Sequence, residues 1–309
     1  MKKILITGGF GMIGRRLVRK LKNKENKVLV LDNFLSKLQP INKINYQKID
    51  ISNKKKLLNI FKKFQPEIVI HLAAIHHIPT CEKKRSYAQK INILSTENLL
   101  HFSEVFKVKK FILASSGAVY DWSNTKLIEN QSKILPRDNY SLCKFSNEIQ
   151  LKLWTQRTNG IGIVARIFNS IGFDDPNSHL LPDILKQIDH KKKNNNIVLG
   201  NLKPRRDYID ASDVASALKK MIKFNKNNYE IFNICNGKEY SVLDVVNVLE
   251  NILSTKINVT SIKSKKRKID RLSQIGSNKK TIKTLKWKPK FDFKQTLKKY
   301  VIEKNFNDQ

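Results

Sequence analysis

The side chains best suited to chemistry in this sequence are a tyrosine and a lysine four residues apart, Tyr140 and Lys144. Residues at this spacing lie on one face of a helix. A phenol has an ordinary pKa near ~10 and is a poor base at neutral pH, but a nearby ammonium group lowers that pKa. The pair therefore predicts that Tyr140 accepts a proton from an alcohol while a nicotinamide cofactor accepts hydride, and Lys144 can also bond the nicotinamide ribose.

A serine is the expected third member of this group. Ser116 follows the apolar run 110–114, which reads as a strand, in the segment Ser-Ser-Gly-Ala-Val-Tyr. A hydroxyl at a strand end can bond the same substrate oxygen as Tyr140 and orient it. The alternative reading of Ser116 is a simple strand-end cap.

The N-terminal segment supplies a place for the cofactor. A short apolar strand at 4–6 is followed by Gly8, Gly11 and Gly14 and then by an amphipathic helix that begins at Met12. Glycines permit a tight turn and close approach of the backbone to a pyrophosphate, and the helix N-terminus offers unpaired N–H groups. The segment therefore predicts a phosphate-binding turn for a dinucleotide.

Residues at the ends of the next strands complete the expected cofactor site. Asp32 ends a strand at 27–31, where a carboxylate would bond the adenosine ribose and repel a 2′-phosphate. This favours NAD over NADP, although a strand-end turn would also explain an aspartate. Ala73 and Ala74 follow a strand at 68–72, and their small side chains would let the cofactor lie against the backbone.

The wider pattern is an alternation of strands and helices. Strands are expected at 4–6, 27–31, 46–51, 68–72, 110–114 and 162–167, and helices from Met12 and at 54–64, 86–106 and 139–157. This order predicts an α/β fold with a doubly wound parallel sheet. After residue 169 the alternation of strands and helices becomes less regular. Helices are expected at 213–224, 242–253 and 279–285, and a strand at 231–234. We predict an NAD-binding Rossmann domain at 1–169 and a smaller, mainly substrate-binding domain at 170–309, with segments that return to the sheet.

Taken together, these motifs resemble those of the extended short-chain dehydrogenase/reductases, in the NAD-dependent sugar-nucleotide epimerase/dehydratase family that includes UDP-glucose 4-epimerases. The resemblance runs nearly from end to end. It rests on T-G-x-x-G-x-x-G at 7–14, Asp32-Asn33, Asp50-Ile51, H-x-A-A at 71–74, S-S-x-x-V-Y at 115–120, Tyr140 and Lys144, R-x-x-N-x-x-G at 166–172, R-D-Y-I-x-x-x-D-V-A at 206–215 and L-x-W-x-P at 285–289.

The resemblance implies roles for individual residues. Ser116, Tyr140 and Lys144 would be catalytic. The cofactor-binding residues would be Gly8, Gly11, Met12, Ile13, Asp32, Asn33, Asp50, Ile51, Leu72, Ala73, Ala74, Tyr140 and Lys144. The substrate-binding residues would be His76, Ser116, Asn169, Arg206 and Arg267, with Asn169 and Arg206 on the nucleotide diphosphate. The resemblance also implies a homodimer built from the helices at 86–106 and 139–157.

The expected reaction is NAD-dependent 4-epimerisation of a nucleotide sugar. Tyr140 takes the proton of the 4-hydroxyl, NAD takes hydride from the same carbon, and hydride returns to the other face of the rotated keto sugar. A dehydratase, decarboxylase or reductase of the same family is the alternative. Related dehydratases and decarboxylases carry an acid between the catalytic hydroxyl and the next tyrosine, whereas this chain has Gly117, Ala118 and Val119.

Composition bears on partners and compartment. The net charge of +34 would suit a nucleic-acid binder, and a non-catalytic nucleotide- or RNA-binding protein on this fold is the alternative of another class. The scattered lysines favour compositional bias instead. Three cysteines without disulfide or metal spacing, no long apolar span and no room for a signal peptide predict a cytoplasmic protein without a membrane anchor. No metal site is expected, and the loop residues His76 and His77 are read as substrate contacts or as plain loop residues.

Overall fold

The computed structural model describes residues 1–36, 38–175, 179–189, 192–226, 228–265 and 271–307. The strands are β1 (Lys2–Thr7), β2 (Asn26–Asp32), β3 (Asn45–Lys48), β4 (Ile68–His71), β5 (Lys110–Ser116), β6 (Ile161–Ile167), β7 (Asn169–Ile171), β8 (Asn194–Leu199), β9 (Arg205–Asp210), β10 (Tyr229–Ile234), β11 (Glu239–Ser241), β12 (Lys256–Ser261) and β13 (Ser273–Gln274). The helices are α1 (Met12–Leu21), α2 (Lys54–Phe64), α3 (Ile78–Lys83), α4 (Arg85–Gln89), α5 (Ser95–Val105), α6 (Asn139–Arg157), α7 (Leu180–Gln187), α8 (Ala211–Ile222), α9 (Val242–Leu253), α10 (Lys279–Leu285) and α11 (Phe293–Asn307). A π-helical turn, η1 (Lys90–Leu94), and two 3₁₀ turns, η2 (Gly117–Val119) and η3 (Lys263–Lys265), complete the list.

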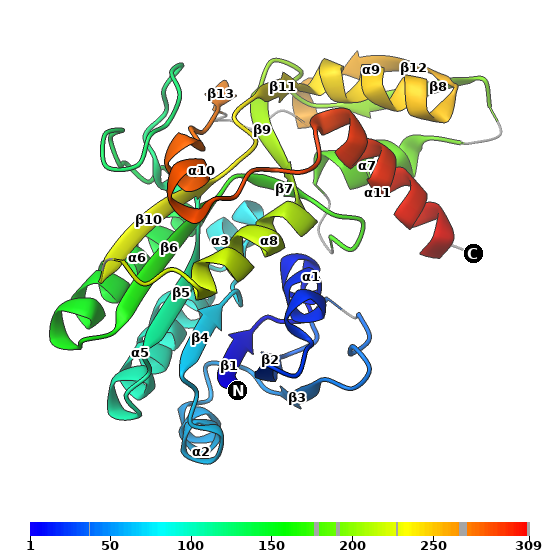
Figure 1. Ribbon diagram of the computed structural model, residues 1–309. Coiled ribbons are helices and arrows are strands. Elements are labelled where there is room, and N and C mark those ends of the chain that lie inside the picture. Colours follow the sequence, from blue (N-terminus) through cyan, green and yellow to red (C-terminus); the bar gives the residue numbers. More distant parts are fainter. Residues whose placement is uncertain (37, 176–178, 190–191, 227, 266–270, 308–309) are drawn as a thin grey trace.

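A seven-stranded parallel sheet forms the larger lobe, in the order β10-β6-β5-β4-β1-β2-β3 (Figure 1). The inner strands are mainly buried apolar runs because helices cover both faces of such a sheet, whereas the edge strand β3 is polar and exposed. The predicted doubly wound parallel sheet is confirmed. The order reverses between β1 and β4, so the carboxyl ends of these two strands border the crevice where open α/β sheets bind ligands.

Two apolar cores lie on opposite faces of this sheet. One core joins α1 and α8 to the sheet through buried side chains such as Leu17, Val18 and Leu218. The other joins α2, α5 and α6 through side chains such as Phe61 and Trp154. Because α1 and α6 carry the glycine turn and the Tyr140–Lys144 pair, both predicted chemical motifs rest on helices that are packed firmly against the sheet.

The C-terminal part of the chain contributes to two regions. Strand β10 extends the large sheet beside β6, and α8 packs on the first core. A second lobe contains β9 with its partners β7, β11 and β13, and the pair β8–β12. Its core unites α7, α9 and α11 (Figure 1). The assignment of 1–169 to cofactor binding and 170–309 mainly to substrate binding remains a prediction.

Several elements differ from the sequence-based expectations. Strand β3 ends at Lys48, three residues early, because Asp50 forms a turn: its backbone oxygen accepts from Asn53 N at 3.0 Å. The helix expected at 86–106 is built from α4, η1 and α5. The expectations contained no α3, α7 or α11 and none of the short strands of the second lobe. Two- to six-residue strands whose partners are distant in sequence carry too few positions for a clear period.

Candidate active site

One large cavity lies between the two lobes, with a volume of about 1760 Å³. Pockets for one small ligand usually measure ~300–1,000 Å³, so this cavity has room for a dinucleotide and a second large ligand. Among the predicted site residues, those that line it are Gly8, Gly11, Met12, Ile13, Asp32, Asn33, Asp50, Ile51, Leu72, Ala73, Ala74, His76, Ser116, Tyr140, Lys144, Asn169 and Arg206. The remaining one, Arg267, lies outside the described residues.

The glycine turn has the geometry of a phosphate cradle. Gly8 has φ +66°, and a Cβ on it would lie 2.7 Å from the backbone nitrogen of Ala73. A Cβ on Gly14 would lie 2.3 Å from the Gly8 oxygen, so this glycine lets α1 pack against the turn. Gly11 is the N-cap of α1 and has no side-chain cap. The first turn of α1 therefore presents backbone N–H groups to the cavity, as a bound pyrophosphate requires.

Asp32 closes the other end of the cofactor region. Its carboxylate accepts hydrogen bonds from Phe10 N at 2.9 Å and Phe34 N at 2.8 Å, which fix it at the end of β2. The same residue lines the cavity together with Asn33 and Asp50. A fixed negative charge at this position fits a ribose with free hydroxyls and disfavours a ribose phosphate.

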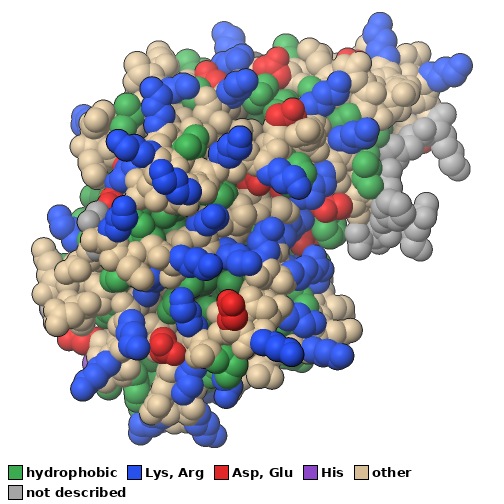
Figure 2. All heavy atoms as spheres, in the orientation of Figure 1, with side chains coloured by type: hydrophobic (Ala, Val, Ile, Leu, Met, Phe, Trp, Pro, Cys, Tyr) green, Lys and Arg blue, Asp and Glu red, His purple; other side chains and the backbone are tan. Residues whose placement is uncertain are grey.

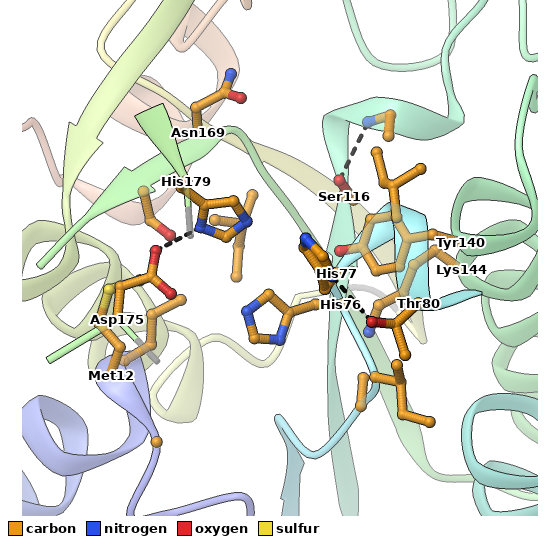
Figure 3. Close-up of a pocket in the computed structure, with 18 of the residues that line it drawn as sticks. Met12, His76, His77, Thr80, Ser116, Tyr140, Lys144, Asn169, Asp175 and His179 are labelled. Atoms are coloured by element: carbon orange, nitrogen blue, oxygen red, sulfur yellow. Dashed lines mark hydrogen bonds and ion pairs between the residues drawn. The ribbon is translucent and has the colours of Figure 1, made fainter. Parts of the chain in front are cut away.

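Ser116, Tyr140 and Lys144 meet on one wall of the cavity (Figure 3). Ser116 is the last residue of β5, and its Oγ accepts from Ala118 N at 3.2 Å. Tyr140 and Lys144 lie one turn apart on α6, whose N-terminus is held by the capping box of Asp138. The Lys144 ammonium donates to the backbone oxygen of Ala114 at 2.7 Å and lies 5.9 Å from the centre of the Tyr140 ring.

The electrostatics of the pair differ from the expectation. Desolvation in the cavity raises the pKa of Tyr140 to about 12, and its hydrogen bond with Ser116 opposes that rise only in part. Burial also lowers the pKa of Lys144 to about 8. The expected lowering of the phenol pKa is therefore not found in this protein without ligands, because desolvation outweighs the hydrogen bond with Ser116.

A buried ionic network supports this wall from behind. Arg166 binds Glu148 in a bidentate manner, with contacts of 2.9 and 2.6 Å, and Ser115 donates to the same carboxylate at 2.5 Å. The Arg166 guanidinium also lies 4.6 Å from the ring centre of Tyr120. Because Ser115 precedes Ser116 and Glu148 lies one turn after Lys144, this network ties β5, α6 and β6 together directly behind the reactive side chains.

The opposite wall comes from the second lobe and carries positive charge. Arg206 donates to the backbone oxygen of Arg271 at 2.6 Å, and Asn169 reaches Gln274 Oε1 at 3.3 Å. Burial, and then the neighbouring Arg206, lower the pKa of Arg271 to about 10, which still leaves it cationic at neutral pH. Arg271 was not among the predicted site residues, although it lies only four residues after the predicted contact Arg267.

Three histidines also face the cavity. His76 and His77 follow β4, and His179 precedes α7, where its Nδ1 lies 2.5 Å from Asp175 Oδ2 (Figure 3). Burial lowers the pKa of His76 to about 4, so this ring is neutral at pH 7. Within the described part of the chain, no group of three or more His, Cys, Asp or Glu side chains has an arrangement that would hold a metal ion.

Comparisons with known proteins agree with this geometry. A UDP-glucose 4-epimerase of Lactobacillus helveticus is 28% identical over 94% of this chain and 93% of its own length. A GDP-6-deoxy-D-mannose reductase of Pseudomonas aeruginosa is 26% identical over 75% of this chain and 78% of its own. The crystal structure of a Thermotoga maritima UDP-glucose 4-epimerase with UDP-glucose superposes with a TM-score of 0.87 at 26% identity, covering 99% of both chains.

The sequence profile of the NAD-dependent epimerase/dehydratase family matches residues 4–235, which include the glycine turn, the Ser116–Tyr140–Lys144 wall and strand β10. The glycine cradle and Asp32 fit the NAD that this family uses. This chain therefore belongs to the NAD-dependent epimerase/dehydratase family.

Proposed function

We propose that this enzyme inverts the 4-hydroxyl of a nucleotide sugar through a transient ketone. The observation that carries the proposal is the convergence of Ser116, Tyr140 and Lys144 on one wall of a cavity large enough for NAD and a nucleotide sugar. The similarity to UDP-glucose 4-epimerases over nearly the whole chain supports the same reaction.

Each residue of the site has its own role in this reaction. When bound, NAD supplies a reversible hydride acceptor. Tyr140 Oη takes the proton of the sugar hydroxyl and later returns it, and Ser116 Oγ orients the same oxygen. Lys144 keeps positive charge beside the ring of Tyr140, which favours the phenolate when the proton has left. Arg206 and Arg271 bind the diphosphate, because two guanidinium groups on one wall suit its paired phosphate oxygens.

The choice of epimerase over dehydratase rests on the acids near the ketone. Gly117, Ala118 and Val119 carry no proton-transfer group. The next carboxylate along the chain, Asp121, pairs with Arg137 at 2.8 Å and Lys133 at 3.5 Å. A carboxylate held between two cations is a poor proton donor because they favour its ionised form.

A panel of UDP-, dTDP- and GDP-sugars, read by NMR and mass spectrometry, tests the proposal. The expected product has the same mass as the substrate and one inverted hydroxyl, with no net formation of NADH. A product lighter by one water or one carbon dioxide would contradict it, as would stoichiometric oxidation or reduction of the cofactor.

We further propose a homodimer formed by the helices at 86–106 and 139–157. Exposed apolar side chains on these helices support it: Tyr87, Leu94, Val105, Leu142, Ile149 and Leu153. Light scattering after size exclusion tests this, with Leu153→Asp expected to shift the protein to monomers. The matched control is Leu243→Asp on α9, since Leu243 is 45% exposed and Leu153 is 47% exposed.

The compartment and the high charge belong to the same proposal. We infer a cytoplasmic enzyme, supported by three buried free cysteines, Cys81, Cys143 and Cys235. No helix in the described residues is long and apolar enough to cross a bilayer. Lys and Arg side chains are dispersed over both lobes on the face in Figure 2 rather than gathered in one stripe. A field of this sign would attract an anionic nucleotide sugar without a nucleic-acid site.

A further inference from the structure

A buried ion pair joins the two lobes beside the glycine turn. Arg16, on α1, donates from Nη1 to Asp174 Oδ1 at 2.6 Å, and the two side chains are only 7% and 2% exposed. Asp174 lies between β7 and α7, so the pair links a helix packed on the large sheet to a segment of the second lobe. The reaction proposed above gives neither residue a role.

Each partner of the pair is also tied to its own lobe. Arg16 Nη1 donates to the backbone oxygen of Met12 at 2.7 Å, one turn earlier on α1. Phe173 packs against the apolar core of the second lobe, and its ring centre lies 5.4 Å from the Arg16 guanidinium. Arg16 Nη2 lies 3.4 Å from Glu303 Oε2 on α11. One guanidinium therefore contacts two second-lobe segments that are far apart in the sequence.

The energetics of such a pair favour a role in fixing position. Asp174 has a second cationic neighbour, because Arg15 Nε lies 3.8 Å from its Oδ2. A buried ion pair adds little to stability compared with apolar side chains of similar size, but separating its charges inside the protein is costly. The pair of Arg16 and Asp174 is therefore better suited to holding two segments in one arrangement than to raising the stability of the fold.

The segment held in this way borders the turn that suits a pyrophosphate. A Cβ on Gly172 would lie 2.7 Å from Met12 Cγ, so the segment contacts the first turn of α1. Gly172, Asp175 and Met12 line the cavity. Figure 3 shows Met12 and Asp175 on the side of the cavity opposite Tyr140. Movement of residues 172–175 away from α1 would therefore open the cavity next to the backbone N–H groups of the glycine turn.

We propose that Arg16 and Asp174 form a clamp between the lobes that slows release of the cofactor, both acting as positioning residues. The inference rests on the proposed function. Hydride must return to the keto sugar from the same cofactor that removed it, so loss of NADH between the two steps would leave the ketone unreduced. A clamp that holds residues 172–175 against α1 makes this loss rarer without touching the reacting atoms.

Stopped-flow fluorescence tests the clamp. Protein loaded with NADH is mixed with excess NAD, and the fall in the fluorescence of bound NADH gives its dissociation rate. Arg16→Leu is expected to raise this rate ~5–150-fold, the usual range for coupling between an interaction and a distant ligand. Arg16→Lys keeps the charge and should restore most of the slow release. Arg19→Leu, at an exposed position of the same helix, is the matched control and should release NADH like wild type.

A second variant keeps the test decisive even if Arg16→Leu does not fold. Asp174→Asn keeps the shape of the side chain and removes its charge, and it should also raise the dissociation rate. The double variant should release NADH no faster than the faster single variant, because the two residues share one interaction. Melting curves of the cofactor-free proteins show whether each variant is folded.

A dissociation rate within about twofold of wild type in folded Asp174→Asn would overturn the inference, as would an equal acceleration in Arg19→Leu. These results differ from a failure of the proposed function, in which no nucleotide sugar would be inverted while the dissociation rates still changed as expected.

Discussion

The two walls of the cavity are built in different ways. On the wall of the larger lobe, Ser116 ends a central strand and Lys144 is 5% exposed, with the Glu148–Arg166 pair directly behind them. On the wall of the second lobe, Arg206 lies on a short strand and donates to the backbone oxygens of Arg205 and Arg271, and His179 lies at a helix start beside the carboxylate of Asp175. The proposed catalytic residues are therefore held by buried ionic and apolar packing, and the proposed substrate contacts lie on short local elements.

We expect this difference to separate the residues that act in catalysis from those that bind the substrate. A buried network keeps distances constant, which proton and hydride transfer require. Substitutions on short strands and at helix starts destabilise the apolar core less. Changes confined to one wall should therefore have effects of different kinds.

The largest effect is expected from Tyr140→Phe. The substitution removes the hydroxyl that accepts the substrate proton but keeps the ring beside Lys144, so kcat should fall by ~10²–10⁴-fold with little change in thermal stability. Steady-state kinetics and a melting curve measure both. Turnover close to wild type would show that the larger-lobe wall does not carry the chemistry.

Glu148→Ala should cause the largest loss of stability. It leaves Arg166 charged and without its carboxylate in a site where both side chains are at most 4% exposed, a change that costs about 3–5 kcal/mol in other proteins. Chemical denaturation measures the free energy of unfolding. The matched control is Lys109→Ala, which breaks an exposed pair with Glu67 at 3.4 Å and should cost about 0–1 kcal/mol. Equal losses in the two variants would refute the rigid support assigned to this wall.

Substitution on the second-lobe wall should act mainly on binding. Arg206→Ala removes a charged hydrogen-bonding group worth about 1.5–3 kcal/mol, which corresponds to a rise in KM of roughly 10- to 150-fold with a smaller change in kcat. The neighbouring Arg205, which pairs with Glu239 at 3.3 Å, serves as control through Arg205→Ala. If Arg206→Ala reduced kcat and left KM unchanged, the division of labour between the walls would be wrong.

The smallest expected effect is a pH dependence set by Lys144. Its pKa of about 8 means that the ammonium is present below pH 8 and is lost as the pH rises, while Tyr140, with a pKa of about 12, does not change. Activity should therefore fall about tenfold by pH 9. Lys144→Arg keeps a positive charge in this range and should show a flat, if lower, profile. If the activity of Lys144→Arg still fell at alkaline pH, the titrating group would be a residue other than Lys144.

The sequence by itself determined the parallel sheet, the glycine turn and the residues of the larger-lobe wall. These features are local: Gly8, Gly11 and Gly14 are contiguous with their strand and helix, and Tyr140 and Lys144 share one helix face. Each long apolar strand has enough residues for its hydrophobic pattern to be recognised in the sequence. The same reasoning located Asp32 and Ser116, because each directly follows such a strand.

Only the tertiary structure decided which residues lie opposite the wall formed by Ser116, Tyr140 and Lys144. Arg271 pairs with Gly117 and Asp121 backbone oxygens more than one hundred residues away, and no local period marks it as a pocket residue. His179 meets His76 only because α7 folds over the cavity. Burial likewise reversed the expected shift of the Tyr140 pKa, since desolvation depends on every segment packed around the phenol rather than on its neighbour in the helix.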